Sequence, residues 1–263
     1  MEFKQFLEEI QMPEGAIQEL LRFQVSRSDY KNLKYLYQNE RDIFFQNVLQ
    51  MADFRIRFLY CFSYMAWELY ESGVWKERCV PFVKHGLDPC RIFIDTFFNL
   101  TLWCEDCYEK TGEYGFLQYD WIWRHLDGSL FRLGRLQFEL LGEDIHIHIP
   151  AGKPLDFEQV QKSLEQAKRV WGMEKRYLCH SWLLYPELKE ILPEESNILK
   201  FQQLFTIISS DYDTREAEER IFGKVEERPE EYPTHTSLQK NARKVLLEGN
   251  QLGNGFGILK EEK

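Results

Sequence analysis

Hydrophobic residues in the first half of the chain recur with the spacing of amphipathic helices. One apolar stripe covers residues 3–10, and longer helical patterns cover residues 41–72 and 89–110. Asp88-Pro89 stands where helices begin, because proline fits the first turn and aspartate caps free amides. Residues 1–114 are therefore predicted to form a helical N-terminal domain.

After Gly115 the pattern changes to alternation, which is typical of strands. A short helix with Asp120 as its N-cap is expected to lead into a hairpin, LFRLGRLQFELLGEDIHIHIP. The elements expected to follow are a helix at 157–171 capped by Asp156, a strand KRYLCHSWLL, a short helix PELKEIL, a strand NILKFQQLFTIISSD, a helix at 235–248 and a last strand in GNQLGNGFGILK. Strands and helices interleave, so residues 115–263 are predicted to form an α/β domain, and the whole chain is an α+β or α/β protein.

The composition narrows the classes of partner and compartment. The 263 residues carry a formal net charge of −10, which disfavours nucleic acid and anionic membrane surfaces as partners. Six cysteines without a secretory signal indicate a reduced, cytoplasmic protein. The most apolar run, FRIRFLYCFSYMAWELY, contains three charged residues and is predicted to be a buried helix. The charged stretch 215–233 is expected to be an exposed helix and linker.

The hairpin places polar side chains on one face of the sheet. A loop of two residues, Gly142-Glu143, or of four gives the same register, with Glu139 opposite His146 and Gln137 opposite His148. A loop of three residues would shift the register by one. Arg135 joins the same polar face, while the isoleucines of DIHIHIP lie on the other face.

Two interpretations of this polar face compete. Glu139 beside His146 favours the imidazolium form of that histidine, which leaves His148 beside neutral Gln137 as a candidate base. Alternatively the face is the solvated side of a sheet, where a Glu–His pair contributes about 0.2–1 kcal/mol.

The strand YLCHSWLL supplies a third histidine. Alternation places His180 on the face opposite to Cys179 and Ser181, so these residues do not form a nucleophile with its base. Its leucine and tryptophan neighbours favour a core position for His180. Together with His146 and His148 it could ligate zinc in a metallohydrolase, but HExxH and paired CxxC motifs are absent from the sequence and no metal is expected.

Several segments together resemble a known bacterial family. LFRLGRLQFEL, IHIPAGKPL, YLCHSWLLYPEL, LPEESNILKFQQLF and THTSLQ occur here in the order found in acyltransferases that join a helical N-terminal domain to a C-terminal domain like the GNAT N-acetyltransferases. The resemblance covers most of the chain and is densest between residues 115 and 245. It implies a GNAT-like mixed sheet flanked by helices.

The resemblance also implies a reaction and its participants. Acetyl-CoA or another acyl-CoA is expected to lie between the strands IHIHIP and YLCHSWLL and to donate its acyl group to the amine of a small-molecule acceptor. The expected bases are His148 and Glu139, with His180 as a second base or a positioning group. The expected cofactor contacts are Ile149, Ala151, Gly152 and Lys153, and the expected substrate contacts are Arg135, Gln137, His146 and Ser181, with Ser181 or Tyr177 beside the leaving thiolate. The oligomeric state is left open.

The phosphate turn departs from the family pattern Arg/Gln-x-x-Gly-x-Gly/Ala. Here only Ala-Gly-Lys-Pro stands in its place, and Pro154 has no amide to donate. Asp156 and Glu158 bring negative charge to the helix start, and Asp156 as N-cap would occupy an amide that a pyrophosphate needs. The alternative hypothesis is therefore a non-catalytic GNAT-like ligand-binding module.

Overall fold

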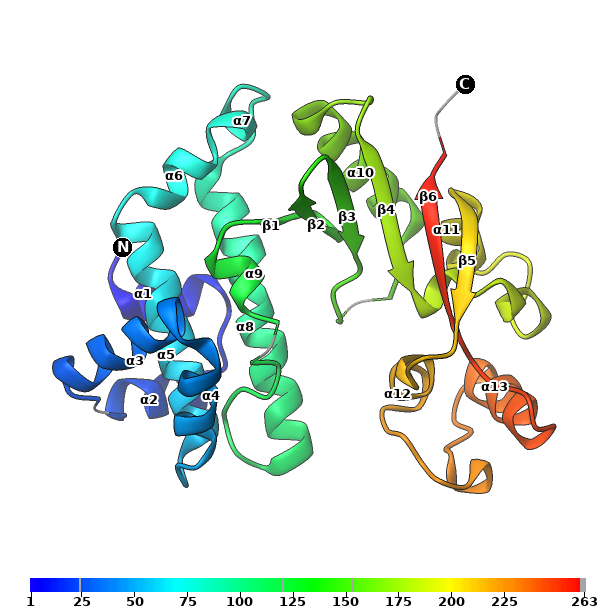
Figure 1. Ribbon diagram of the computed structural model, residues 1–263, viewed down its shortest axis with the longest axis horizontal. Coiled ribbons are helices and arrows are strands. Elements are labelled where there is room, and N and C mark those ends of the chain that lie inside the picture. The colour runs from blue at the N-terminus through cyan, green and yellow to red at the C-terminus, as the bar shows by residue number, and fades with distance from the viewer. Residues whose placement is uncertain (24, 120, 153, 261–263) are drawn as a thin grey trace. The chain divides into compact units, whose positions relative to one another are not determined.

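The computed structural model describes residues 1–23, 25–119, 121–152 and 154–260 (Figure 1). Asp120, the predicted N-cap, lies outside the described residues. The chain divides into two compact units. The first unit comprises Met1–Leu133 with Pro150–Gly152, and the second comprises Gly134–Ile149 with the chain that follows Gly152.

The first unit is built from helices, as predicted. They are α1 (Phe3–Glu9), α2 (Glu14–Arg22), α3 (Arg27–Asn39), α4 (Arg41–Leu49), α5 (Phe54–Glu71), α6 (Val74–Arg78), α7 (Val80–Val83), α8 (Pro89–Thr111) and α9 (Trp123–Leu126), followed by the strand β1 (Leu130–Leu133). The Asp88 carboxylate accepts a hydrogen bond from the Cys90 amide at the start of α8, and Gly112 ends that helix with a φ of 75°. The rings of Phe58 and Phe62 stack in the core. None of the described helices is long and apolar enough to cross a membrane.

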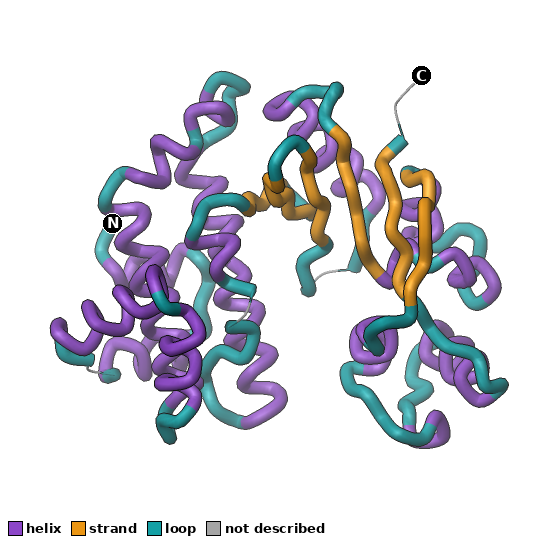
Figure 2. Tube along the Cα trace, viewed as in Figure 1, coloured by secondary structure: helices purple, strands orange, loops and turns teal. Residues whose placement is uncertain are grey.

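The strands form one six-stranded mixed sheet in the order β1-β2-β3-β4-β6-β5 (Figure 2). The strands after β1 are β2 (Leu136–Leu141), β3 (Asp144–His148), β4 (Arg176–Ser181), β5 (Phe205–Asp211) and β6 (Asn254–Leu259). β3 runs parallel to β4, whereas β2 with β3, β4 with β6 and β5 with β6 are antiparallel. The fold class predicted from the sequence is confirmed.

Helices of the second unit cover one face of its strands. The helix α10 (Phe157–Trp171) lies behind the sheet in Figure 1, and its Trp171 ring lies 5.7 Å from the Phe138 ring of β2. Ile145 and Ile147 are buried on this face, as their alternation with histidines predicted. The opposite face therefore carries the histidines of β3.

Several predicted elements differ from the structure. The helical pattern at 41–72 is divided into α4 and α5, and the strand predicted in KRYLCHSWLL ends at Ser181. The segment 197–211 is a helix, α11 (Asn197–Gln203), followed by β5, because the Ser196 hydroxyl caps the Ile198 amide and begins a helical turn. The segment PELKEIL forms a 3-10 helix, η2 (Pro186–Glu190), which follows η1 (Trp182–Leu184). A short apolar run does not distinguish a strand from a buried helix, which explains the difference at 197–211.

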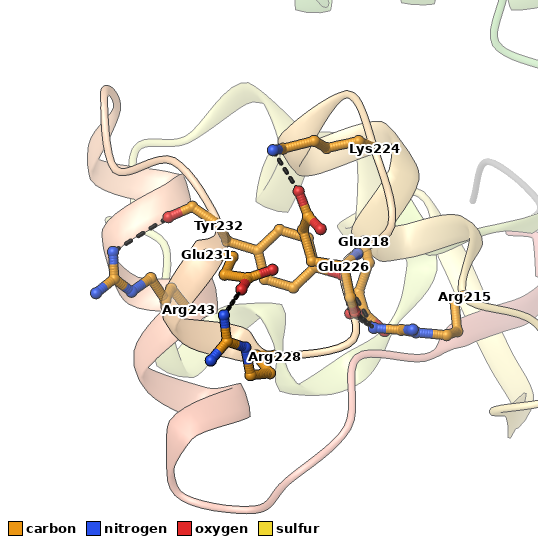
Figure 3. Close-up of polar contacts among 8 residues, drawn as sticks. All are labelled: Arg215, Glu218, Lys224, Glu226, Arg228, Glu231, Tyr232 and Arg243. Atoms are coloured by element: carbon orange, nitrogen blue, oxygen red, sulfur yellow. Dashed lines mark hydrogen bonds and ion pairs between the residues drawn. The ribbon is translucent and has the colours of Figure 1, made fainter.

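The charged stretch 215–233 is only partly exposed. It contains α12 (Glu216–Phe222) and η3 (Pro229–Glu231), and α13 (Ser237–Leu247) follows them. Glu218 is buried, accepts hydrogen bonds from Arg215 at 2.7 and 2.5 Å, and accepts another from the Tyr232 hydroxyl at 2.5 Å (Figure 3). The prediction of an exposed face is wrong here, because the buried carboxylate has partners that compensate for its lost hydration.

Candidate active site

The parallel pairing of β3 and β4 covers only the start of both strands. Its three pairs are Asp144 with Arg176, Ile145 with Tyr177, and His146 with Leu178. Beyond them β4 continues to Ser181, where it pairs with β6 and no longer with β3 in the described part of the sheet. The facing edges of β3 and β4 therefore separate after His146 and Leu178, leaving backbone groups that an extended ligand can bind.

The register of the hairpin is confirmed, but the carboxylate pairs with the other histidine. Glu139 lies opposite His146, and Gln137 lies opposite His148, across a two-residue turn at Gly142-Glu143. Nevertheless the Glu139 Oε2 atom lies 2.8 Å from Nε2 of His148. A diagonal neighbour is within reach of a long side chain, so register alone did not decide the partner.

Burial changes the expected charges on this face. Glu139 and Gln137 are only 2% and 1% exposed, so the interpretation as a solvated sheet face is wrong. Burial, and next the neighbouring His148, lower the pKa of His146, which contradicts the expected imidazolium at that position. Arg135 lies in the turn before β2 and not on the strand, so its predicted place on this face is wrong. Burial lowers the pKa of Arg135, and its backbone amide donates to the Ser163 hydroxyl at 2.9 Å.

His180 lies at the surface, and the prediction of a core position is wrong. Its side chain is 49% exposed, and its Nε2 atom lies 2.6 Å from Oδ2 of Asp211 at the end of β5. The hydrogen bond from His180 lowers the pKa of Asp211. Asp211 was not predicted from the sequence, because 31 residues separate it from His180 and no local pattern joins them.

The residues expected beside the leaving thiolate have structural partners. The Ser181 hydroxyl accepts a hydrogen bond from the Leu183 amide and so caps η1. The Tyr177 hydroxyl donates to the Gly172 carbonyl at 2.9 Å. The Tyr177 hydroxyl thus uses its one donor on the backbone, whereas the Ser181 hydroxyl only accepts here and can still donate to a substrate.

The phosphate turn has only part of the expected geometry. Ala151 and Gly152 are exposed, and Gly152 has a φ of 106°, which glycine adopts without strain. Ile149 is half-buried and directly follows β3, and Lys153 lies outside the described residues. The Asp156 carboxylate accepts from the Gln159 amide at 2.9 Å, so one amide at the start of α10 is occupied, as predicted.

Among the described residues, no group of three or more His, Cys, Asp or Glu side chains is arranged to hold a metal ion. His146, His148 and His180 therefore do not form the zinc site that was considered from the sequence. Instead, two of these histidines each contact one carboxylate, Glu139 or Asp211.

Comparison with protein families assigns both parts of the chain. Residues 1–128 match the N-acyltransferase N-terminal domain, and residues 130–259 match the GNAT-like C-terminal domain. No curated protein matches the chain.

Solved structures share the fold. An acyltransferase in complex with decanoyl-CoA and teicoplanin is 22% identical with a TM-score of 0.78, and the match covers 98% of this chain and 87% of that one. A mutant acyltransferase in complex with octanoyl-CoA is also 22% identical, with a TM-score of 0.76 and the same coverage. An acyltransferase in complex with decanoyl-CoA is 23% identical, covers the same shares and has a TM-score of 0.74.

Proposed function

Because the chain belongs to the family that joins an N-acyltransferase N-terminal domain to a GNAT-like C-terminal domain, we propose that it transfers an acyl group from acyl-CoA to an amine of a small-molecule acceptor. One observation carries this proposal: β3 separates from β4 beside a histidine that contacts a buried carboxylate. Separated strand edges offer amides and carbonyls to an extended thioester, and a paired histidine offers a base.

His148 is the proposed base. An amine attacks a thioester only as the neutral amine, so its proton must leave before or during formation of the carbon–nitrogen bond. The Glu139 carboxylate holds the His148 ring and stabilises the imidazolium that forms. Backbone amides near Ile149 and Ala151 are proposed to bind the developing oxyanion.

The remaining polar residues are proposed to contact the substrates. Arg135, Gln137, His146 and Ser181 are the proposed substrate contacts, and Gly152 and Lys153 are the proposed cofactor contacts. The structural neighbours contain decanoyl-CoA, octanoyl-CoA and the glycopeptide teicoplanin. We therefore include medium-chain acyl-CoA and glycopeptide amines, besides acetyl-CoA, among the substrates to be tested.

A thermal-shift assay tests binding first. Acetyl-CoA, octanoyl-CoA, decanoyl-CoA and free CoA are added separately, and a ligand at 100 times its Kd stabilises the folded state by about 2.7 kcal/mol. Mass spectrometry then follows acyl transfer to a panel of primary amines that includes teicoplanin. An unchanged melting temperature with every CoA species at millimolar concentration would contradict the proposal.

The second candidate function is a non-catalytic ligand-binding module. It is favoured by the Asp156 side chain, which occupies an amide where a pyrophosphate would bind. Stabilisation by CoA without transfer to any amine of the panel would support this module, whereas transfer would exclude it.

A further inference from the structure

A second histidine–carboxylate pair lies on the face of the sheet that carries His148. Residues paired across neighbouring strands project to the same face, and His146 pairs with Leu178. His148 and His180 each follow that pair by two residues, so they share this face. Continuing the register would place the two histidines opposite each other, where the strand edges have separated.

The contact with Asp211 fixes which nitrogen of His180 remains available. An ionised carboxylate only accepts hydrogen bonds, and the lowered pKa of Asp211 keeps it ionised, so Nε2 of His180 must be the donor. Among the described residues, Nδ1 of His180 has no hydrogen-bond partner. The contact therefore leaves Nδ1 for a ligand bound between the strands: Nδ1 accepts a hydrogen bond when the ring is neutral and donates one when the ring is an imidazolium.

The two pairs differ in their access to water. The side chains of His180 and Asp211 are 49% and 31% exposed, whereas those of His148 and Glu139 are 23% and 3% exposed. A more exposed group takes up a proton from solvent more readily, so His180 is the better placed of the two histidines to do so. A group that holds a proton transiently works better beside a buried carboxylate.

We propose that Asp211 is a positioning residue that holds His180 to protonate the thiolate of CoA as it leaves. The inference rests on the proposed acyl transfer. The amine nitrogen forms a bond to the acyl carbon and loses one proton to His148, while the carbon–sulfur bond breaks and the sulfur takes one proton from Nδ1 of His180. His148 then releases its proton to water and His180 takes one from water, so the cycle closes without another reactant.

Imidazole NMR of the full chain tests this assignment. The protein has six histidines, and His180→Gln and His148→Gln identify two of the six ¹⁵N-labelled rings. Spectra are recorded with free CoA and with desulfo-CoA, which lacks the thiol. We expect CoA to shift the His180 signals and desulfo-CoA to leave them unchanged, while both ligands shift other signals.

Asp211→Asn should abolish the thiol-dependent shift of His180 and change the Kd of CoA by less than about threefold, because an exposed ion pair adds little to affinity. Asp144→Asn is the matched control, since Asp144 forms an ion pair with Arg176 at the other end of the same strands and should keep the shift. Asp211→Glu should restore part of it.

The outcomes are distinguishable. Equal His180 signals with CoA and desulfo-CoA, or a thiol-dependent shift that survives in Asp211→Asn, would overturn this inference while CoA binding stands. Absence of any spectral change and of any thermal shift with CoA would overturn the proposed function and this inference with it.

Discussion

The Glu139 carboxylate is buried and contacts the His148 ring, which lies where β3 separates from β4. Burial of an ionised group is costly unless a partner compensates for lost hydration. This one hydrogen bond is therefore expected to contribute both to the stability of the fold and to the rate of acyl transfer. Removal of either partner should affect both, and the two effects must be measured separately.

We expect His148→Ala to lower the rate of acyl transfer by about 10²–10⁴-fold, the usual contribution of a general base, while CoA affinity stays nearly unchanged. Release of CoA from acyl-CoA gives the rate, and the thermal shift gives the affinity. Glu139→Gln serves as the companion variant and should retain binding while slowing transfer. A loss of folding in His148→Ala would mean that this histidine is structural.

Glu218 is a second buried carboxylate, but its role is structural (Figure 3). Burial by itself would raise the pKa of Glu218, yet the hydrogen bonds from Arg215 and Tyr232 outweigh it and lower the pKa below its usual value. The Tyr232 hydroxyl also accepts from the Glu226 amide at 2.8 Å. One tyrosine therefore joins α12 to the loop that follows it.

Tyr232→Phe should lower the free energy of unfolding by about 1.5–3 kcal/mol, since it removes a hydrogen bond to a charged group. Urea denaturation measures the change, and Tyr35→Phe, at a 57% exposed tyrosine, is the control.

The stabilisation from Glu218 is present above the usual carboxyl pKa and is lost as pH falls through the lowered pKa of the folded state. The difference between Glu218→Gln and wild type should therefore shrink in acid; a constant difference would contradict this account.

At the scale of elements, β6 contains glycines because another segment crosses it closely. A Cβ atom on Gly255 would lie 2.1 Å from the Leu184 carbonyl oxygen in η1. This spacing is below any normal contact, and backbone cannot move aside as a flexible side chain can. The glycine at this position therefore determines where η1 packs on the sheet.

Gly255→Ala should lower the free energy of unfolding by about 3 kcal/mol, through the forced displacement of η1. The control is Gly223→Ala, where a Cβ atom would meet nothing within 4 Å but a φ of 77° costs about 1–2 kcal/mol. Both values come from urea denaturation. Equal losses in the two variants would show that the close approach is not decisive.

At the scale of the whole molecule, five of the six cysteines are buried, and Cys90 is exposed. Burial raises the pKa of Cys61 and Cys104 to about 12, which keeps both as unreactive thiols at neutral pH. Thiol reactivity can therefore report global unfolding.

Ellman's reagent should label one thiol quickly in the native protein and six in denaturant. Cys90→Ser should abolish the fast reaction without affecting the slow ones. Rapid labelling of two or more thiols in the native state would contradict the burial of the others. The same variant allows released CoA to be measured without a background from the protein.

Local patterns determined most of the helices, the hairpin and its register. Asp88 and Asp156 cap the helices that begin beside them, and the turn glycines end neighbouring elements. These effects are local, so those helix boundaries could be predicted from the sequence alone. The boundary proposed between residues 114 and 115 stays a prediction, as do the roles of the site residues. The helix α11 was missed, because a short apolar run fits either period.

The tertiary structure decided which charges meet. Alternation placed Glu139 and His148 on one face, but only side-chain geometry paired them diagonally. Asp211 reached His180 through the order of β4, β6 and β5, which no spacing along the chain encodes. The sequence determines the face on which a side chain lies because the strand period is local, whereas the partner of that side chain depends on strand order and packing, which are properties of the folded chain.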